Sequence, residues 1–378
     1  MFKEFNSLLE LITVFPDEQT CIEYLEYVRW EGNVVSPYDP SSKVYKCKGN
    51  NYKCKNTGQY FNAKTGTMFH RSSIPLQKWF VAIWLVTSHK KGISSVQLGK
   101  DISVTQKTAW FMLQRIREAF SDENDLHCDD EGNDGKLKEN VEIDESFIGG
   151  KNKNRHRDKK VEHCQGRSFK DKVPVFGLLE RGNRVIAKVV PDTKVKTLEP
   201  LIFHYVRVAC NLFSDEWNYG KGIDEFYHHR HVDHGKGFYG VGDLTTNSIE
   251  SFWALIKRSI LGIYYRWSKK HMQRYINECV YRYNTRKCSD KERFELLLQN
   301  MECRLTYKDL IPFLLAAAAA SCAPGSWFSP SVITIMALPT FSCWVKLLEA
   351  KSIASPILVP WVWIRPGVMF WRNIFAET

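Results

Sequence analysis

The sequence lacks regular cysteine spacing and a secretory leader. Its 11 Cys residues form an odd number at irregular intervals. The first residues, MFKEFNSLLELITVF, lack a basic segment followed by an apolar stretch and a small-residue cleavage site. Both absences argue against a secreted scaffold held by disulfides. We therefore expect an intracellular protein with reduced thiols, nuclear if its host is eukaryotic.

The end of the chain has little charge. Residues 311–378 contain only six charged side chains: Lys346, Glu349, Lys351, Arg365, Arg372 and Glu377. Prolines divide the uncharged stretch Ile311–Val345 into apolar pieces shorter than the roughly 20 residues that a membrane-spanning helix needs. We therefore expect no membrane anchor. Residues 303–378 form an atypical hydrophobic tail, either an extension of the reading frame or a buried helical layer.

Positive charge exceeds negative charge over the whole chain. The 378 residues include 53 Lys and Arg against 42 Asp and Glu, a formal net charge of +11. An excess of this size favours an anionic partner, most often nucleic acid. The length allows two or three domains.

The first 70 residues divide into a helical part and a strand-rich part. In residues 1–35, apolar side chains recur at helical spacing on both sides of a break at Pro16, which predicts helices. In residues 36–70 the pattern changes to short alternating stretches around Gly49 and Gly58, typical of hairpins. We therefore predict a small β module after the N-terminal helices.

Residues 75–120 have the pattern of three helices separated by short turns. Pro75 opens the first helix, Gly92 ends it, and a short and a longer helix follow. A DNA-binding helix-turn-helix places the start of its second helix in the major groove, where Gln106 and Lys107 would reach base edges. An ordinary helical hairpin fits the same pattern equally well.

An acidic linker separates these helices from a strand-rich region. Residues 121–140 contain eight acidic side chains and almost no apolar ones, which is typical of a solvated segment. Residues 141–302 then show three strand patterns, a helix over 194–208, another strand, and helices over 246–260 and 269–286. This order predicts an α/β fold.

Three acidic residues of this region lie where a strand pattern ends or a helix presents one face. Asp144 lies in the strand pattern VEIDES, and Asp215 ends the pattern CNLFSD. Glu250 borders the apolar stripe of TNSIESFWALIKRSI, in line with Lys257. Each position alone is more typical of a turn or a solvated helix face. Together the three carboxylates are what a site for two Mg²⁺ or Mn²⁺ ions needs, because hard cations prefer oxygen ligands.

The order of the motifs resembles that of the DDE transposases of the Merlin superfamily in eukaryotes and of their bacterial insertion-sequence relatives, which share an ISXO-like transposase domain. The resemblance covers roughly residues 15–300 and is carried by PDEQTCIEYLEYVRW, VEIDESFIGGK, KVPVFGLLERG, HVDHGKGFYG and TNSIESFWALIKR, among others. It implies a catalytic domain of RNase H-like fold over 141–302, with Asp144, Asp215 and Glu250 as its catalytic, metal-binding triad.

The resemblance also suggests DNA contacts around this triad. Lys257 matches a basic residue that would contact the DNA backbone, and Asn247 is a candidate both for DNA contact and for replacing Glu250. The basic run 151–160, which includes Arg155 and Arg157, directly follows the first strand pattern. This run would bind DNA phosphates, act as a nuclear import signal, or form a plain solvated loop.

The sequence departs from the resemblance at the β module. Relatives carry a zinc ribbon of two Cys-x-x-Cys knuckles, and the matching positions here hold Ser36, Asp39, Cys54 and Thr57. One thiolate does not complete the four-ligand site of a structural zinc. Cys47 lacks knuckle spacing to Cys54. We therefore expect a degenerate zinc-ribbon-like module without structural zinc.

Three hypotheses about function follow. The first is a DNA transposase that cuts at transposon ends and transfers the 3′-OH end to target DNA by two-metal phosphoryl transfer, acting as a homo-oligomer on double-stranded DNA. The second is a domesticated or decayed DNA-binding protein without catalysis, which the lost zinc ligands and the atypical tail favour. The third is a structure-selective nuclease on the same fold.

Overall fold

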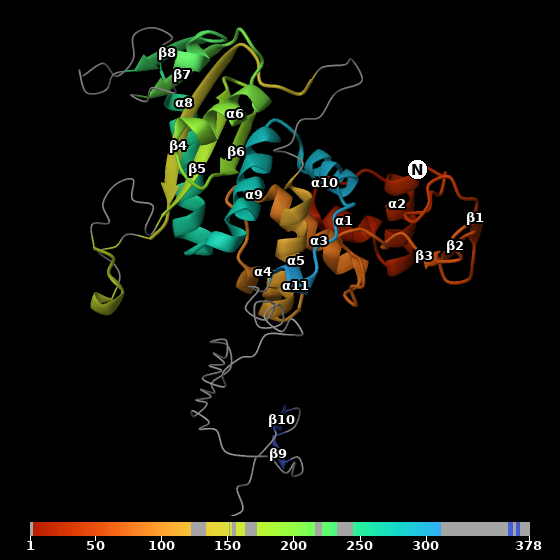
Figure 1. Ribbon diagram of the computed structural model, residues 1–378. Coiled ribbons are helices and arrows are strands. Elements are labelled where there is room, and N and C mark those ends of the chain that lie inside the picture. The colour runs from red at the N-terminus through yellow and green to blue at the C-terminus, as the bar shows by residue number, and fades with distance from the viewer. Residues whose placement is uncertain are drawn as a thin grey trace, which may run out of the picture. The chain divides into compact units, whose positions relative to one another are not determined.

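The computed structural model describes residues 3–121, 134–150, 152, 156–162, 172–215, 221–232, 245–310, 362–365 and 368–370. The chain divides into two compact units, Met1–Ile311 and Pro312–Thr378. In the described part of the second unit, strands β9 (Val362–Arg365) and β10 (Val368–Phe370) pair as an antiparallel hairpin (Figure 1). Most of the tail predicted over 303–378 lies outside the described residues. No helix in the described part of the chain is long and apolar enough to span a membrane.

Two helices and a small sheet begin the first unit. They are α1 (Leu8–Val14), α2 (Glu18–Trp30), β1 (Val44–Lys46), β2 (Tyr52–Cys54) and β3 (Tyr60–Phe61). Both helices have a side-chain cap, from Ser7 and Asp17, which accepts a backbone N–H of the first turn. The three strands pair antiparallel in the order β1-β2-β3. The predicted succession of helices and short strands is confirmed.

Three further helices, as predicted, occupy the next segment. They are α3 (Leu76–Ser88), α4 (Ser95–Asp101) and α5 (Gln106–Ala119). The turn between α4 and α5 depends on Gly99, because a Cβ at this position would lie 3.0 Å from the carbonyl oxygen of Val104. Ser94 and Thr105 cap the two helices at their N-termini.

A helix from much later in the sequence completes the core of this region. The helix α10 (Asp290–Gln299) packs against α3 and α2. Its Phe294 is fully buried, with ring centroids 5.6 Å from Phe5 and 5.5 Å from Phe80. The residues before 121 therefore share one apolar core with residues near 300.

A five-stranded mixed sheet forms the other part of the first unit. Its strands are β4 (Asn140–Ile148), β5 (Val173–Glu180), β6 (Val185–Val189), β7 (Asn211–Asp215) and β8 (His228–Val232), in the order β6-β5-β4-β7-β8. The first three strands pair antiparallel, whereas β7 and β8 run parallel to β4. The predicted α/β class is confirmed. The strand β8 was not predicted, because its histidine-rich sequence lacks an apolar alternation.

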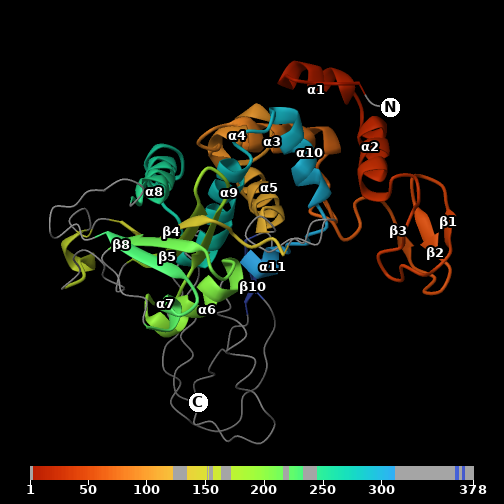
Figure 2. The same ribbon diagram turned by 90° about the horizontal axis from the view of Figure 1, so that it is seen from above.

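Helices cover both faces of the sheet (Figure 2). On one face, α6 (Val195–Tyr205) buries its apolar side chains against β4, β5, β6 and β7. On the other face lie α8 (Asn247–Ser259) and α9 (Met272–Asn284), packed on alternate residues of β5 and β6. The remaining short helical elements are η3 (Arg157–Lys159), α7 (Lys221–Asp224), η5 (Ile260–Tyr264), η6 (Lys269–His271) and α11 (Tyr307–Leu310).

A buried ion network joins α5 to α9. The guanidinium of Arg117 lies 2.6 Å from the Glu278 carboxylate, and both side chains are 1% exposed. Arg282 forms a second ion pair with Glu278, and the hydroxyl of Tyr264 donates to the same carboxylate at 2.5 Å. These pairs hold the pKa of Glu278 low, at about 2, against the opposing effect of its burial. The network fixes the helices before residue 121 onto the helices that cover the sheet.

Candidate active site

Two aspartates lie side by side on neighbouring inner strands of the sheet. The parallel register of β4 and β7 pairs Glu142 with Phe213 and Ile143 with Ser214. The next residues along the two strands are Asp144 and Asp215. Neighbouring strands lie about 4.8 Å apart, and side chains in register point to the same face. The structure thus brings these two predicted site residues together on the face that α8 covers.

Glu250 lies on the helix that covers the same face of the sheet as the two aspartates. It lies in the first turn of α8, which packs on β4 and β5, and it accepts a hydrogen bond of 3.3 Å from the Thr246 hydroxyl. Burial and, to a smaller extent, the negative charges of Asp215 and Glu250 together raise the pKa of Asp144 to about 6. Asp215 and Glu250 therefore each lie close enough to Asp144 for their charges to act on its carboxylate.

A tryptophan that the sequence analysis did not single out holds the first aspartate. The indole Nε1 of Trp253 donates a hydrogen bond of 3.0 Å to Oδ2 of Asp144, and the Glu145 N–H donates to Oδ1 at 2.8 Å. Both bonds favour the ionised carboxylate. The ring lies where Gly177 leaves space, because a Cβ on Gly177 would be 2.6 Å from Trp253 Cζ2. Gly177 pairs directly with Asp144 across β4 and β5.

A second buried carboxylate fixes the start of α8. Glu142, which is fully buried, accepts a hydrogen bond of 2.9 Å from the Ile249 N–H and pairs with Arg181 at 2.8 Å. Arg181 also donates to the Thr245 carbonyl at 2.5 Å. A carboxylate at this end of a helix satisfies a free N–H and interacts favourably with the helix dipole. Glu142 and Arg181 thereby fix the first turn that carries Glu250.

Sequence reasoning missed these supporting residues for different reasons. The alternation that placed Asp144 on one face of its strand places Glu142 on the same face. Trp253 stands one helical turn after Glu250, in the apolar stripe. The strand alternation and the helical spacing were both visible in the sequence, but neither pattern identifies the hydrogen-bond partner of a side chain.

The three carboxylates are suitable ligands for a divalent metal ion, but their present arrangement does not form a metal-binding site. Oxygen donors suit Mg²⁺ and Mn²⁺, and a cation would relieve the repulsion that raises the pKa of Asp144. Among the residues that the structure describes, however, no three His, Cys, Asp or Glu side chains are grouped closely enough to hold a metal ion. Binding would require the side chains to turn toward one another.

The two predicted DNA contacts on α8 lie on its solvent side. Asn247 is the first residue of the helix and is exposed. Lys257 is also exposed, seven residues after Glu250 and hence about 10 Å further along the axis. It forms no hydrogen bond or ion pair with any described residue.

The other predicted DNA contacts lie on separate elements. Gln106 begins α5 and donates to the Ser95 hydroxyl at 2.9 Å, whereas the Lys107 ammonium lies 5.8 Å from the centre of the Tyr307 ring. Arg157 is exposed in η3, and Arg155 lies outside the described residues. No described contact joins any of them to the three carboxylates.

Three of the four positions matched to zinc ligands converge in the β module. Burial would raise the pKa of the Cys54 thiol, but hydrogen bonds with Ser36, Ser42 and Thr57 outweigh it and lower the pKa to about 6. Asp39 instead accepts hydrogen bonds from Ser41 and Asn56. Ser42 does not hold a position matched to a zinc ligand, yet it forms a hydrogen bond with the Cys54 thiol, whereas the Asp39 carboxylate bonds to Ser41 and Asn56.

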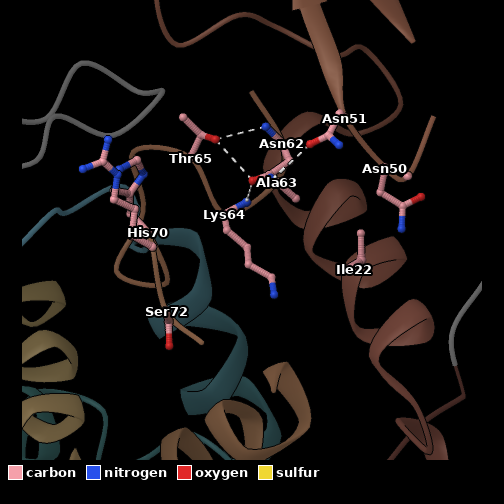
Figure 3. A pocket seen from close by; sticks show the side chains of 11 residues that line it. Ile22, Asn50, Asn51, Asn62, Ala63, Lys64, Thr65, His70 and Ser72 are labelled. Atoms are coloured by element: carbon pink, nitrogen blue, oxygen red, sulfur yellow. Dashed lines mark hydrogen bonds between the residues drawn. The ribbon is translucent and has the colours of Figure 1, made fainter. Parts of the chain in front are cut away.

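A polar pocket of about 450 Å³ lies beside this module (Figure 3). Its lining includes Asn50, Asn62, Lys64, His70 and Arg71. The ammonium of Lys64 is paired with Glu18 at 2.6 Å. Burial and neighbouring arginines lower the pKa of His70. None of the predicted site residues lines this pocket.

Two comparisons with known proteins match this chain to a transposase domain and to a protein of a transposable element. Residues 136–284 match the family described as ISXO2-like transposase domain. The chain is 28% identical over 263 residues to an uncharacterized protein in transposable element ISH50 of Halobacterium salinarum, an alignment that covers 65% of this chain and 84% of the relative. No solved structure gives a significant match. The two similarities support a transposase family of insertion sequences.

Proposed function

We propose that this protein is a DNA transposase with Asp144, Asp215 and Glu250 as a DDE catalytic triad on a domain of RNase H-like fold. The observation that supports the proposal is the placement of Asp215 beside Asp144 by the register of β4 and β7, with α8, which carries Glu250, packed on β4. The effect of both charges on the pKa of Asp144 agrees with this placement. The match to the ISXO2-like transposase domain spans all three residues. The order of the motifs further supports a place in the Merlin superfamily.

The triad would hold two divalent cations, Mg²⁺ or Mn²⁺. When bound, such ions polarise the phosphate oxygens and lower the pKa of the attacking water. The residues of this chain supply the ionised carboxylates, and the Trp253 indole keeps that of Asp144 oriented toward the edge of the sheet. The Glu142–Arg181 pair holds the first turn of α8, and with it Glu250, over the same edge.

The reaction consists of two phosphoryl transfers. In the first, a water oxygen forms a bond to phosphorus at the transposon end, the bond to the 3′-oxygen breaks, and that oxygen takes up a proton. In the second, the freed 3′-hydroxyl oxygen attacks a phosphodiester of the target DNA, so that one P–O bond replaces another and the hydroxyl proton passes to the leaving oxygen.

DNA would be bound by side chains outside the triad. Gln106 and Lys107 would contact base edges, with Gln106 first released from Ser95. Lys257, Asn247, Arg155 and Arg157 would contact phosphates, which position DNA without reading its sequence. The chain would act as a homo-oligomer, because a transposon has two ends to be joined.

The test is cleavage of DNA taken from the two borders of the element that encodes the protein. In Mg²⁺ or Mn²⁺ the parent protein should nick at the element's end, and Asp144→Asn and Asp215→Asn should not. Asp192→Asn, on the loop before α6, is the matched control and should retain activity. Nicking by Asp144→Asn and Asp215→Asn at the rate of the parent protein would contradict the proposed site.

The same assay separates the two other functions. DNA binding that persists in EDTA, without cleavage in either metal ion, would select the non-catalytic DNA-binding protein that the lost zinc ligands favour. Equal cleavage of duplexes with and without the element's ends would select a structure-selective nuclease.

A further inference from the structure

The turn that follows α8 exposes two large apolar side chains. Leu261 is 76% exposed and Tyr265 is 81% exposed. Leu261 lies in the π-helical turn η5, which continues α8, and Tyr265 follows η5 directly with a φ of 56°. A left-handed backbone is unfavourable for an aromatic residue, and both π-turns and such backbone outliers occur preferentially at functional sites.

The turn is held rigidly by the aromatic residues beside Tyr265. Tyr264 packs edge-on against Tyr275 at 5.1 Å and donates its hydroxyl to the buried Glu278. Trp267 stacks on Tyr275, with ring centroids 5.1 Å apart and an interplanar angle of 20°. The residues on both sides of Tyr265 are therefore packed in place, and a partner that contacts its ring does not have to order this turn on binding.

Four cations without partners among the described residues lie within four positions of Leu261 or Tyr265 in the sequence. Lys257, Arg258, Arg266 and Lys269 are all exposed, and none forms a side-chain hydrogen bond or ion pair with a described residue. The sequence has no acidic residue between Glu250 and Glu278. Leu261 lies eleven residues after Glu250, about 16 Å along the helix. This surface thus combines unpaired positive charge with an exposed ring, close to the proposed site of cleavage.

Building on the proposed function, we infer that Tyr265 stacks on an unpaired base of the DNA strand near the cleaved phosphodiester, while Lys257, Arg258, Arg266 and Lys269 bind the flanking phosphates. Aromatic side chains stack on any base, and apolar wedges inserted at base steps separate them. Leu261 would fill the space beside the displaced base. The charge of the surface favours DNA over a second copy of this chain, which carries a positive net charge itself.

The test compares the full chain on two fluorescent duplexes in EDTA, where no cleavage occurs. One duplex is blunt, and the other has the same sequence with a few unpaired bases at one end. The parent should bind the second duplex more tightly. Tyr265→Ala should lose about tenfold in affinity for it and little for the blunt duplex, because the stacking contact with the unpaired base is lost. Tyr265→Phe, which keeps the ring, should retain the preference.

Lys269→Gln is the charge control. It should weaken binding of both duplexes alike. It should also reduce the dependence of the affinity on salt concentration by the amount expected for about one phosphate contact. An unchanged preference in Tyr265→Ala would overturn the inference while leaving the proposed function intact. Failure of the parent to bind either duplex would overturn both. A change in sedimentation with an unchanged DNA preference in Tyr265→Ala would assign the surface to a second copy of the chain.

Discussion

Trp253 and Asp144 are joined by a hydrogen bond of 3.0 Å from the indole Nε1 to the carboxylate Oδ2. The bond links α8, which carries Glu250, to β4, which carries Asp144. It therefore connects the two structural elements whose relative position decides whether the three carboxylates meet. It also acts against burial and the neighbouring negative charges, which together raise the pKa of Asp144 to about 6.

Trp253→Phe removes this donor and keeps an aromatic ring of similar shape. We expect the pKa of Asp144 to rise, because a hydrogen bond to its ionised form is lost. The rate of DNA cleavage should fall by about tenfold near neutral pH, since a hydrogen bond to a charged group contributes about 1.5–3 kcal/mol. The pH at half-maximal rate should move upward, as measured from the rate–pH profile.

Trp267→Phe is the matched control for this change. Trp267 is also buried, but its Nε1 has no hydrogen-bond partner among the described residues. Its replacement should leave the pH profile in place. A shift of equal size in both variants would mean that the Trp253 bond has no specific role at Asp144.

Gly177→Ala should displace Trp253 without touching a carboxylate. The added Cβ would lie 2.6 Å from Cζ2 of the indole, and overpacking of this kind costs about 1–3 kcal/mol. We expect a loss of this size in the free energy of unfolding in urea, together with reduced cleavage. Gly150→Ala, where a Cβ meets no atom of a described residue within 4 Å, should change neither quantity.

Glu142→Gln tests the support of α8. The variant leaves Arg181 without its charged partner, and breaking a buried ion pair costs about 3–5 kcal/mol. Because Arg181 is 22% exposed and keeps some access to water, we expect a loss near the lower end, about 3 kcal/mol. Chemical denaturation measures it. Glu225→Gln, at an exposed position, should be neutral, and equal losses in both variants would refute the specific role of Glu142.

Asp144→Asn should stabilise the protein when no metal is present. The pKa of Asp144 is raised from 3.8 to about 6 on folding, so the folded state binds more protons than the unfolded state between these values. Its contribution to stability is present below pH 4 and is lost as the pH rises through 6. In EDTA the variant should therefore unfold at a higher temperature than the parent at pH 7.5, with little difference at pH 4.

Asp192→Asn provides the opposite case for this measurement. Hydrogen bonds from Thr197 and Lys194 lower the pKa of Asp192, so its ionised form is favoured on folding. This variant should show no gain in stability at pH 7.5. A gain in both variants, or in neither, would contradict the repulsion inferred at Asp144.

Local pattern was sufficient to predict most helices and most strands, although no helix was predicted over α10. The apolar spacing before and after Pro16, the three helical pieces over 75–120 and the alternation around Asp144 were all visible within a few residues. The strand β8 was missed because His228 and its neighbours do not alternate in hydrophobicity. The assignment of α10 to the core of the N-terminal helices was not predictable either, since its partners are about 200 residues away.

By itself the sequence determined the α/β class, most of the succession of elements and the three carboxylates proposed for the site, because helical and strand periodicity are encoded by neighbouring residues. Only the tertiary structure decided what these carboxylates contact. The register of β4 against β7 places Asp144 beside Asp215, and the packing of α8 brings Trp253 over Gly177. Register and packing depend on the shapes and hydrogen-bonding groups of residues far apart in the chain, which no local spacing records.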